Sequence, residues 1–186
     1  MRTVRSTTPL LPVVQEPRVQ RCGHYIADFT PQEAQALSYL ALDLTAIQIA
    51  EAINHEPDRE NARPVSSDMV RDRLNSLRVK AGAQTWVQLV DVACRTKLLL
   101  PRPATLKEPL PAQAVATMRL AVLGHTHHRI AAIRGISPAT VAAHLAQVRY
   151  RMRTHKLPAA VYRLHGVPGV LNSAPYCLAC RTGGTT

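Results

Sequence analysis

The stretch of sequence that decides the fold is Ile130-Ala-Ala-Ile-Arg-Gly-Ile-Ser-Pro-Ala-Thr-Val-Ala-Ala-His-Leu145. The segment Gly135-Ile-Ser137 in its middle is typical of a tight turn, and Pro138 fits the first turn of a new helix. In that new helix, Val141 and Leu145 lie four residues apart on one stripe, while the other positions are mostly small or polar. Two short helices joined by such a turn predict a helix-turn-helix motif.

Apolar residues at helical spacing extend this motif to four helices in each half of an all-α chain. In the second half we expect helices at Ala112–Leu123, at Thr126–Arg134, from Ser137 onward and at Pro158–His165. In the first half we expect them after the N-caps Thr30 and Thr45, from Ser66 onward and at Trp86–Cys94. The pairing of Phe29-Thr-Pro-Gln-Glu-Ala-Gln-Ala-Leu37 with Leu110-Pro-Ala-Gln-Ala-Val-Ala-Thr-Met118 indicates a weak internal repeat.

The segment Ile130–Leu145 resembles the turn and recognition helix of LuxR-type regulators. The first half, with Phe29-Thr-Pro-Gln-Glu33 and Val65-Ser-Ser-Asp-Met-Val-Arg-Asp-Arg-Leu-Asn-Ser-Leu-Arg-Val-Lys-Ala-Gly82, is similar to the same domain. The resemblance implies two tandem four-helix domains in a transcription regulator that binds double-stranded DNA. It also implies that the third helix of each domain enters the major groove and that the fourth helix often pairs two copies.

On this basis the chain divides into a basic N-terminal arm (1–28), a first domain (29–100), a Pro-rich linker (101–109), a second domain (110–166) and a tail (167–186). The first domain departs from the family by an insert, residues 54–64, which places Glu56, Asp58 and Glu60 where carboxylates oppose phosphate binding. A linker of about ten residues reaches roughly 33 Å when extended, so one chain can span two half-sites one DNA turn apart.

Charge is distributed unevenly along the chain, whose formal net charge is +11. Residues 100–186 contain 11 basic residues and a single acidic one, Glu108, whereas residues 29–99 contain 8 basic and 9 acidic residues. A half this basic is typical of a surface that binds a polyanion. No apolar run approaches the roughly 20 residues of a spanning helix, so we expect no membrane partner and a cytoplasmic, nucleoid-associated protein.

The candidate DNA-binding residues lie on the two third helices and at the second helix of the second domain. In the second domain they are Thr126, His127, His128, Ser137, Thr140, Ala142, Ala143, His144, Gln147, Arg149, Arg151 and Arg153. In the first domain they are Ser67, Arg71, Arg73, Asn75, Arg78 and Lys80. Gln147 is suited to an adenine edge, and the alanine methyls to a thymine methyl. The alternative is that the small residues only permit a close approach to the groove.

The candidate metal ligands are Cys22, His24, Cys177 and Cys180, which form a tetrahedral zinc site only if the chain ends meet. The alternative is two pairs of reduced thiols in flanking tails, with no cofactor. Cys94 is predicted to be a buried structural thiol, and Trp86 is predicted to lie in the core.

Two functions remain open. The first is a sequence-specific DNA-binding regulator, acting as one chain or as a homodimer. The second is an adaptor, in which the first domain docks RNA polymerase, a sigma factor or another regulator while the second domain holds DNA. An enzyme is not expected, because the chain lacks a phosphate-cradling glycine loop, a His-Glu-x-x-His motif and paired carboxylates in its basic half.

Overall fold

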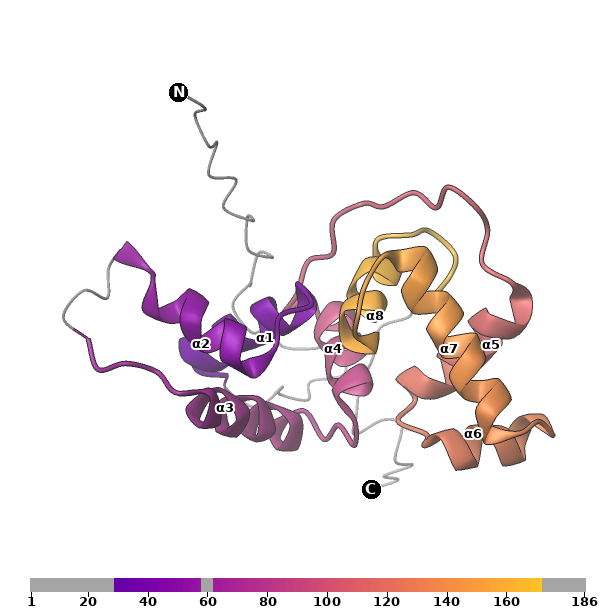
Figure 1. The fold of residues 1–186 in the computed structure, drawn as a ribbon, viewed down its shortest axis with the longest axis horizontal. Coiled ribbons are helices and arrows are strands. Elements are labelled where there is room, and N and C mark those ends of the chain that lie inside the picture. The colour runs from indigo at the N-terminus through magenta and orange to yellow at the C-terminus, as the bar shows by residue number, and fades with distance from the viewer. Residues whose placement is uncertain (1–28, 58–61, 172–186) are drawn as a thin grey trace, which may run out of the picture.

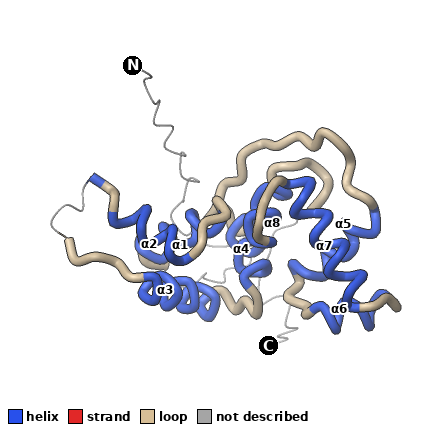
Figure 2. The backbone as a smooth tube through the Cα atoms, viewed as in Figure 1, coloured by secondary structure: helices blue, strands red, loops and turns tan. Residues whose placement is uncertain are grey.

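The computed structural model describes residues 29–57 and 62–171. In this part of the chain there are eight α-helices and no β-strand (Figure 1, Figure 2). The helices are α1 (Pro31–Ala41), α2 (Ala46–Asn54), α3 (Ser67–Lys80), α4 (Trp86–Arg95), α5 (Ala112–Val122), α6 (His127–Arg134), α7 (Pro138–Met152) and α8 (Leu157–His165). The all-α prediction is therefore confirmed for the described residues.

Helix starts follow the capping residues of the sequence. Thr30 accepts a hydrogen bond from the backbone N–H of Glu33, and the Glu33 carboxylate accepts one in return from the N–H of Thr30. Thr45 caps α2 and Ser66 caps α3 in the same way, each accepting from the N–H three residues ahead. The predicted starts at these three residues are confirmed.

The two halves repeat one order of helix lengths. Helices α1 to α4 have 11, 9, 14 and 10 residues, and α5 to α8 have 11, 8, 15 and 9 residues. The connections between the second and third helices differ. Gly135, with φ of 62°, makes the short turn between α6 and α7, whereas the α2–α3 connection contains the insert. Asn54 closes the ends of that insert, because its side chain exchanges two hydrogen bonds with the backbone of Val65 (2.8 and 2.9 Å).

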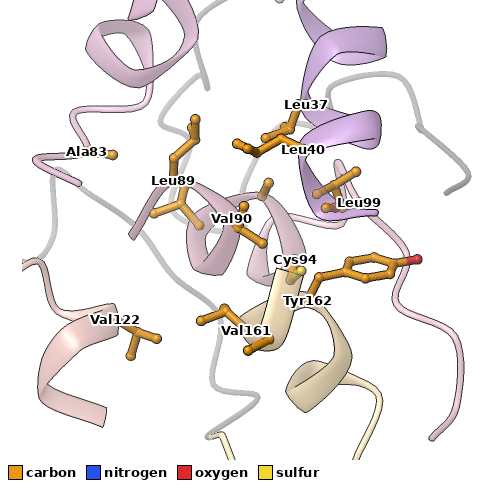
Figure 3. Packing of buried hydrophobic residues seen from close by; sticks show 14 of the residues in the cluster. Leu37, Leu40, Ala83, Leu89, Val90, Cys94, Leu99, Val122, Val161 and Tyr162 are labelled. Atoms are coloured by element: carbon orange, nitrogen blue, oxygen red, sulfur yellow. The ribbon is translucent and has the colours of Figure 1, made fainter. Parts of the chain in front are cut away.

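Helices α4 and α8 pack against each other in the middle of the molecule, between α1–α3 and α5–α7 (Figure 1). A single hydrophobic cluster runs through this contact, so the two halves share one core. Figure 3 shows Val90 and Cys94 of α4 together with Val161 and Tyr162 of α8 in this cluster. Burying a valine side chain of this kind stabilises the fold by about 1.5 to 3 kcal/mol. This stabilisation would be lost if the two halves separated.

The connection between the halves is attached to α8. Leu99 is fully buried, and the Tyr162 hydroxyl donates to the carbonyl of Leu100 (3.1 Å). The N–H of Ala104 donates to the carbonyl of Gly166 (2.9 Å). Gly166 is needed there, because a Cβ atom would lie 2.0 Å from the carbonyl oxygen of Arg102. The spacing of the two halves is therefore set by the packing of α4 on α8 and not by the reach of an extended linker.

Two side chains of α4 are predicted to be buried, and the outcomes differ. Cys94 is buried, which confirms the structural-thiol prediction, and burial raises the pKa of its thiol well above the usual value. The prediction that Trp86 lies in the core is wrong, because 36% of the residue is exposed. The guanidinium of Arg78 lies over its ring, 5.6 Å from the centroid, in a cation–π contact.

Each half also contacts the turn that joins the first two helices of the other half. Asp43 follows α1 in a left-handed conformation (φ 76°), and its carboxylate accepts from the N–H groups of His155 (2.5 Å) and Lys156 (2.8 Å). The N-cap residue Lys156 makes no side-chain cap on α8, and the Asp43 carboxylate of the other half binds the N–H groups of Lys156 and of the residue before it. In the reverse direction, a Cβ atom on Gly124 would lie 2.5 Å from the side-chain oxygen of Gln88 on α4.

We predict that Asp43→Asn lowers the free energy of unfolding by about 1 to 2 kcal/mol, measured by urea denaturation. Asparagine tolerates the left-handed backbone, but its NH2 group faces an N–H donor where a carboxylate oxygen accepted. Asp68→Asn is the matched control, because the exposed Asp68 pairs only with Arg71 of its own helix. Equal stability losses in the two variants would show that the bonds from Asp43 to the start of α8 do not stabilise the fold.

Candidate nucleic-acid interface

Helix α7 rests on α5 and α6 through one apolar stripe. Val141, Leu145 and Val148 are 0 to 2% exposed, and they lie at the spacing that the sequence predicts for the inward side. Ser137 caps the helix by accepting from the N–H of Thr140 (3.0 Å), and the hydroxyls of these two residues lie 2.8 Å apart. The turn before α7 therefore holds the helix in a fixed orientation on its supporting helices.

The opposite side of α7 is formed by small side chains. Ala139, Ala142 and Ala143 are exposed, and Gln147 is half-buried beside them. Tyr150 continues this outward side and is 80% exposed. Tyr150 is not among the residues predicted from the sequence, although its position seven residues after Ala143 places both on one side of a helix. Small side chains let a helix backbone come close to a groove, where alanine methyls contact thymine methyls.

His144 is oriented by a hydrogen-bond network on the flank of α7. Thr117, fully buried on α5, donates its hydroxyl proton to the carbonyl of Gln113 (2.9 Å) and accepts from Arg134. Its contact with Nδ1 of His144 (3.0 Å) fixes the orientation of the imidazole ring.

The basic residues at the end of α7 have different partners. Arg149 donates to the carbonyl of His155 (3.0 Å), and Arg151 forms an ion pair with Glu108. Arg153 ends the helix in a left-handed conformation (φ 50°) and is exposed. The single acidic residue of the basic half is thus paired with a residue of the predicted recognition helix.

The start of α6 presents an open helix N-terminus. Thr126 caps it by accepting from the N–H of Arg129 (3.3 Å), and His127 and His128 are exposed in its first turn. An N-terminus of this kind attracts phosphate through its N–H groups and its dipole.

The outward side of α3 is different in character. Asp68, Asp72, Asn75 and Val79 are exposed and follow helical spacing opposite the buried Val70. Among its predicted DNA-binding residues, Asn75 thus lies on the outward side, while Ser67 and Arg73 are half-buried.

Three cations of α3 are held by contacts within the protein. Arg71 pairs with Asp68, and Lys80 pairs with Glu33 (2.9 Å). Arg78 lies over Trp86. Lys80 and Arg78 are therefore less available to a phosphate than the sequence of α3 indicates, whereas the exposed Arg71 can leave Asp68 at little cost.

The insert places one of its acids against α1. The carboxylate of Glu56 accepts from the Gln35 amide (2.8 and 2.9 Å) and from the Tyr39 hydroxyl (3.0 Å). Burial, followed by this contact, raises the pKa of Tyr39 to about 12. Asp58 and Glu60 lie outside the described residues.

The four candidate zinc ligands, Cys22, His24, Cys177 and Cys180, also lie outside the described residues. Among the residues that are described, no group of three or more His, Cys, Asp or Glu side chains is placed to hold a metal ion. No helix in the same part of the chain is long and apolar enough to cross a membrane. The zinc site stays a prediction.

The second half of the chain matches a known protein family. Residues 109–164 match the family of bacterial regulatory proteins, luxR family, which covers α5 to α7 and nearly all of α8. Residues 109–164 form a LuxR-family helix-turn-helix domain. Domains of this family bind DNA in transcription regulators, so the match supports a DNA-binding regulator in general. No curated protein and no solved structure matches the chain.

Glu33 makes the stability of the first half dependent on pH. Burial raises the pKa of Glu33, but hydrogen bonds from Ser76, Lys80 and the Thr30 backbone outweigh it and lower the pKa to about 2. A lowered pKa stabilises the fold above the unfolded value of 4.5, and the stabilisation is lost as pH falls toward 2.

We predict that Glu33→Gln costs about 2 to 3 kcal/mol of unfolding free energy at neutral pH and much less near pH 2. Urea denaturation of both proteins across this range measures the difference. Glu51→Gln, at an exposed position on α2, is the control. A constant gap between the Glu33→Gln and unaltered proteins at all pH values would contradict the prediction.

Proposed function

We propose that the chain is a sequence-specific regulator that binds double-stranded DNA with α7 in the major groove. The observation that carries this is the outward side of α7: within the LuxR-family domain, it presents alanines, Gln147 and Tyr150 and no carboxylate. The open N-terminus of α6 and the basic end of α7 lie on the same domain and suit phosphates on either side of the groove.

We further propose that the first half is a divergent copy of this domain, paired with the second within one chain. The repeated order of helices supports this, and so does the central position of α4 and α8, the fourth helix of each half. A chain paired in this way needs no second copy to complete its core. Because the two third helices differ, its DNA site is asymmetric.

The second candidate function is the adaptor, and the outward side of α3 favours it. Asp68 and Asp72 occupy the places that Ala139 and Ala143 occupy on α7, relative to the buried Val70 and Val141. Carboxylates at these places repel DNA phosphates, whereas a basic surface on RNA polymerase or on another regulator complements them. In this candidate α7 holds DNA and α3 contacts a protein.

We predict that Ala143→Asp weakens DNA binding about tenfold or more, because it places a carboxylate on the side of α7 that faces DNA. Ala143→Asn is the matched control, since it adds a similar volume without charge. Fluorescence anisotropy with a labelled duplex, selected from a random pool by the unaltered chain, measures the affinity. Equal affinities for the two variants would rule out α7 as the helix in the groove.

The corresponding change on α3, Asp72→Asn, separates the two candidates in the same assay. If α3 also lies in a groove, removing the carboxylate raises DNA affinity several-fold, as charge repulsion requires. If α3 contacts a protein, the DNA affinity stays within about twofold, as expected for an exposed charge away from the interface.

We predict that one chain of 20.4 kDa occupies one duplex, which the mass of the complex measures by analytical ultracentrifugation. The physical reason is the shared core, which already places α4 against α8 within one chain. Two chains on a symmetric footprint would overturn the single-chain arrangement and favour a homodimer.

A further inference from the structure

A cleft lies between residues 104–108 and the end of α7. Its volume is about 440 Å³, and it is lined in part by Lys107, Arg151, Arg153 and Arg163, with Glu108 as its one carboxylate. Four cations against one anion make the cleft strongly positive. We refer to it as the 104–108 cleft.

Glu108 places an anion in this cleft in the absence of any ligand. It is the single acidic residue between positions 100 and 186, and its carboxylate pairs with Arg151. The side chain of Glu108 is 64% exposed. An exposed ion pair of this kind is worth at most about 1 kcal/mol, so a phosphate can take the place of the carboxylate at little cost.

The end of α7 does not repel an anion in the way an open helix C-terminus does. Arg163 donates to the carbonyl oxygens of Met152 (2.7 Å) and Arg153 (3.3 Å), which lie at that end. A cation bound to the last carbonyls offsets the negative end of the helix dipole. The positive charge of Lys107 and Arg153 therefore acts in the cleft without that opposing field.

Tyr150 connects the cleft to the outward side of α7. It lines the cleft, and it also continues the exposed side that begins at Ala139 and Ala143. Where DNA lying along that side passes the end of α7, its sugar-phosphate backbone comes to the mouth of the cleft.

We propose that the 104–108 cleft binds a backbone phosphate of the DNA through Lys107, Arg151 and Arg153, with Arg151 released from Glu108. This inference rests on the proposed function. Through Lys107, it assigns to the connection between the halves a direct role in binding DNA beside the residues at the end of α7. A phosphate contact fixes the register of the protein on the duplex without reading sequence.

The test compares charge-removing variants of the full chain in DNA binding at several salt concentrations. Lys107→Gln is expected to weaken binding to all duplexes alike and to reduce the slope of log K against log salt by about 0.9. Glu108→Gln is expected to strengthen binding, because Arg151 no longer has a competing anion. The matched controls are Lys97→Gln and Glu51→Gln, which remove one exposed charge each outside the cleft.

The inference is overturned if the unaltered chain binds DNA while Lys107→Gln and Glu108→Gln behave like their controls. That outcome leaves the proposed function intact. A chain that binds no duplex at all refutes the proposed function itself, and with it the DNA source of the phosphate.

A second arm distinguishes a phosphate of DNA from free phosphate. Inorganic phosphate is titrated into the DNA-free chain, and NMR shifts of Tyr150 and Lys107 are followed. Saturation at millimolar phosphate, combined with DNA binding that Lys107→Gln leaves unchanged, assigns the cleft to a free anion and overturns the proposal. Loss of DNA affinity in Lys107→Gln together with weak, non-saturating phosphate shifts supports it.

Discussion

The contact between α4 and α8 is the constraint on which the rest of the structure depends. A four-helix unit of this size buries a limited share of its surface and is marginal by itself. Packing the fourth helices against each other extends the core of each half into the other. Asp91 of α4 lies in this contact, 1% exposed, between Arg95 of its own helix and His165 of α8, each at 2.8 Å. A buried carboxylate requires such partners, so the pairing of the two helices is specific in geometry as well as apolar.

The packing of α4 on α8 fixes the position of α3 relative to α7. The side chains of these two helices nevertheless give them different charge. α7 presents alanines and Gln147 outward, whereas α3 presents Asp68 and Asp72. On α3, Arg71 pairs with Asp68, while Lys80 pairs with Glu33 and Arg78 lies over Trp86. An arrangement in which both halves met phosphates equally would bring the exposed carboxylate of Asp72 toward those phosphates. The difference in charge between the two halves of the sequence is therefore also present between the outward sides of α3 and α7 in the folded protein.

Local interactions made much of the helix pattern predictable. Thr30, Thr45 and Ser66 mark helix starts because a cap bonds to an N–H only three residues away. The candidate site was predictable in part, because an inward stripe such as Val141 and Leu145 defines an outward side. Contacts between distant residues could not be predicted in this way. Asp43 binds backbone N–H groups at the start of a helix more than one hundred residues later, and Glu108 pairs with Arg151 at the end of α7. Trp86 illustrates the same limit, since the apolar sequence around it gave no sign that Arg78 covers its ring.

The alanine-rich side of α7 also indicates that the affinity for DNA and the specificity for its sequence come from different contacts. Gln147 is one side chain there able to make a bidentate contact with a base, worth about 1 to 3 kcal/mol of discrimination. Phosphate contacts, in contrast, act on every sequence and weaken steeply with salt. A protein with few base contacts and a basic half depends on its phosphate contacts to fix the register of the helix in the groove. The position of those contacts is then as important as their number, and a connection anchored to α8 at Leu100 and Ala104 places Lys107 in the cleft at the end of α7.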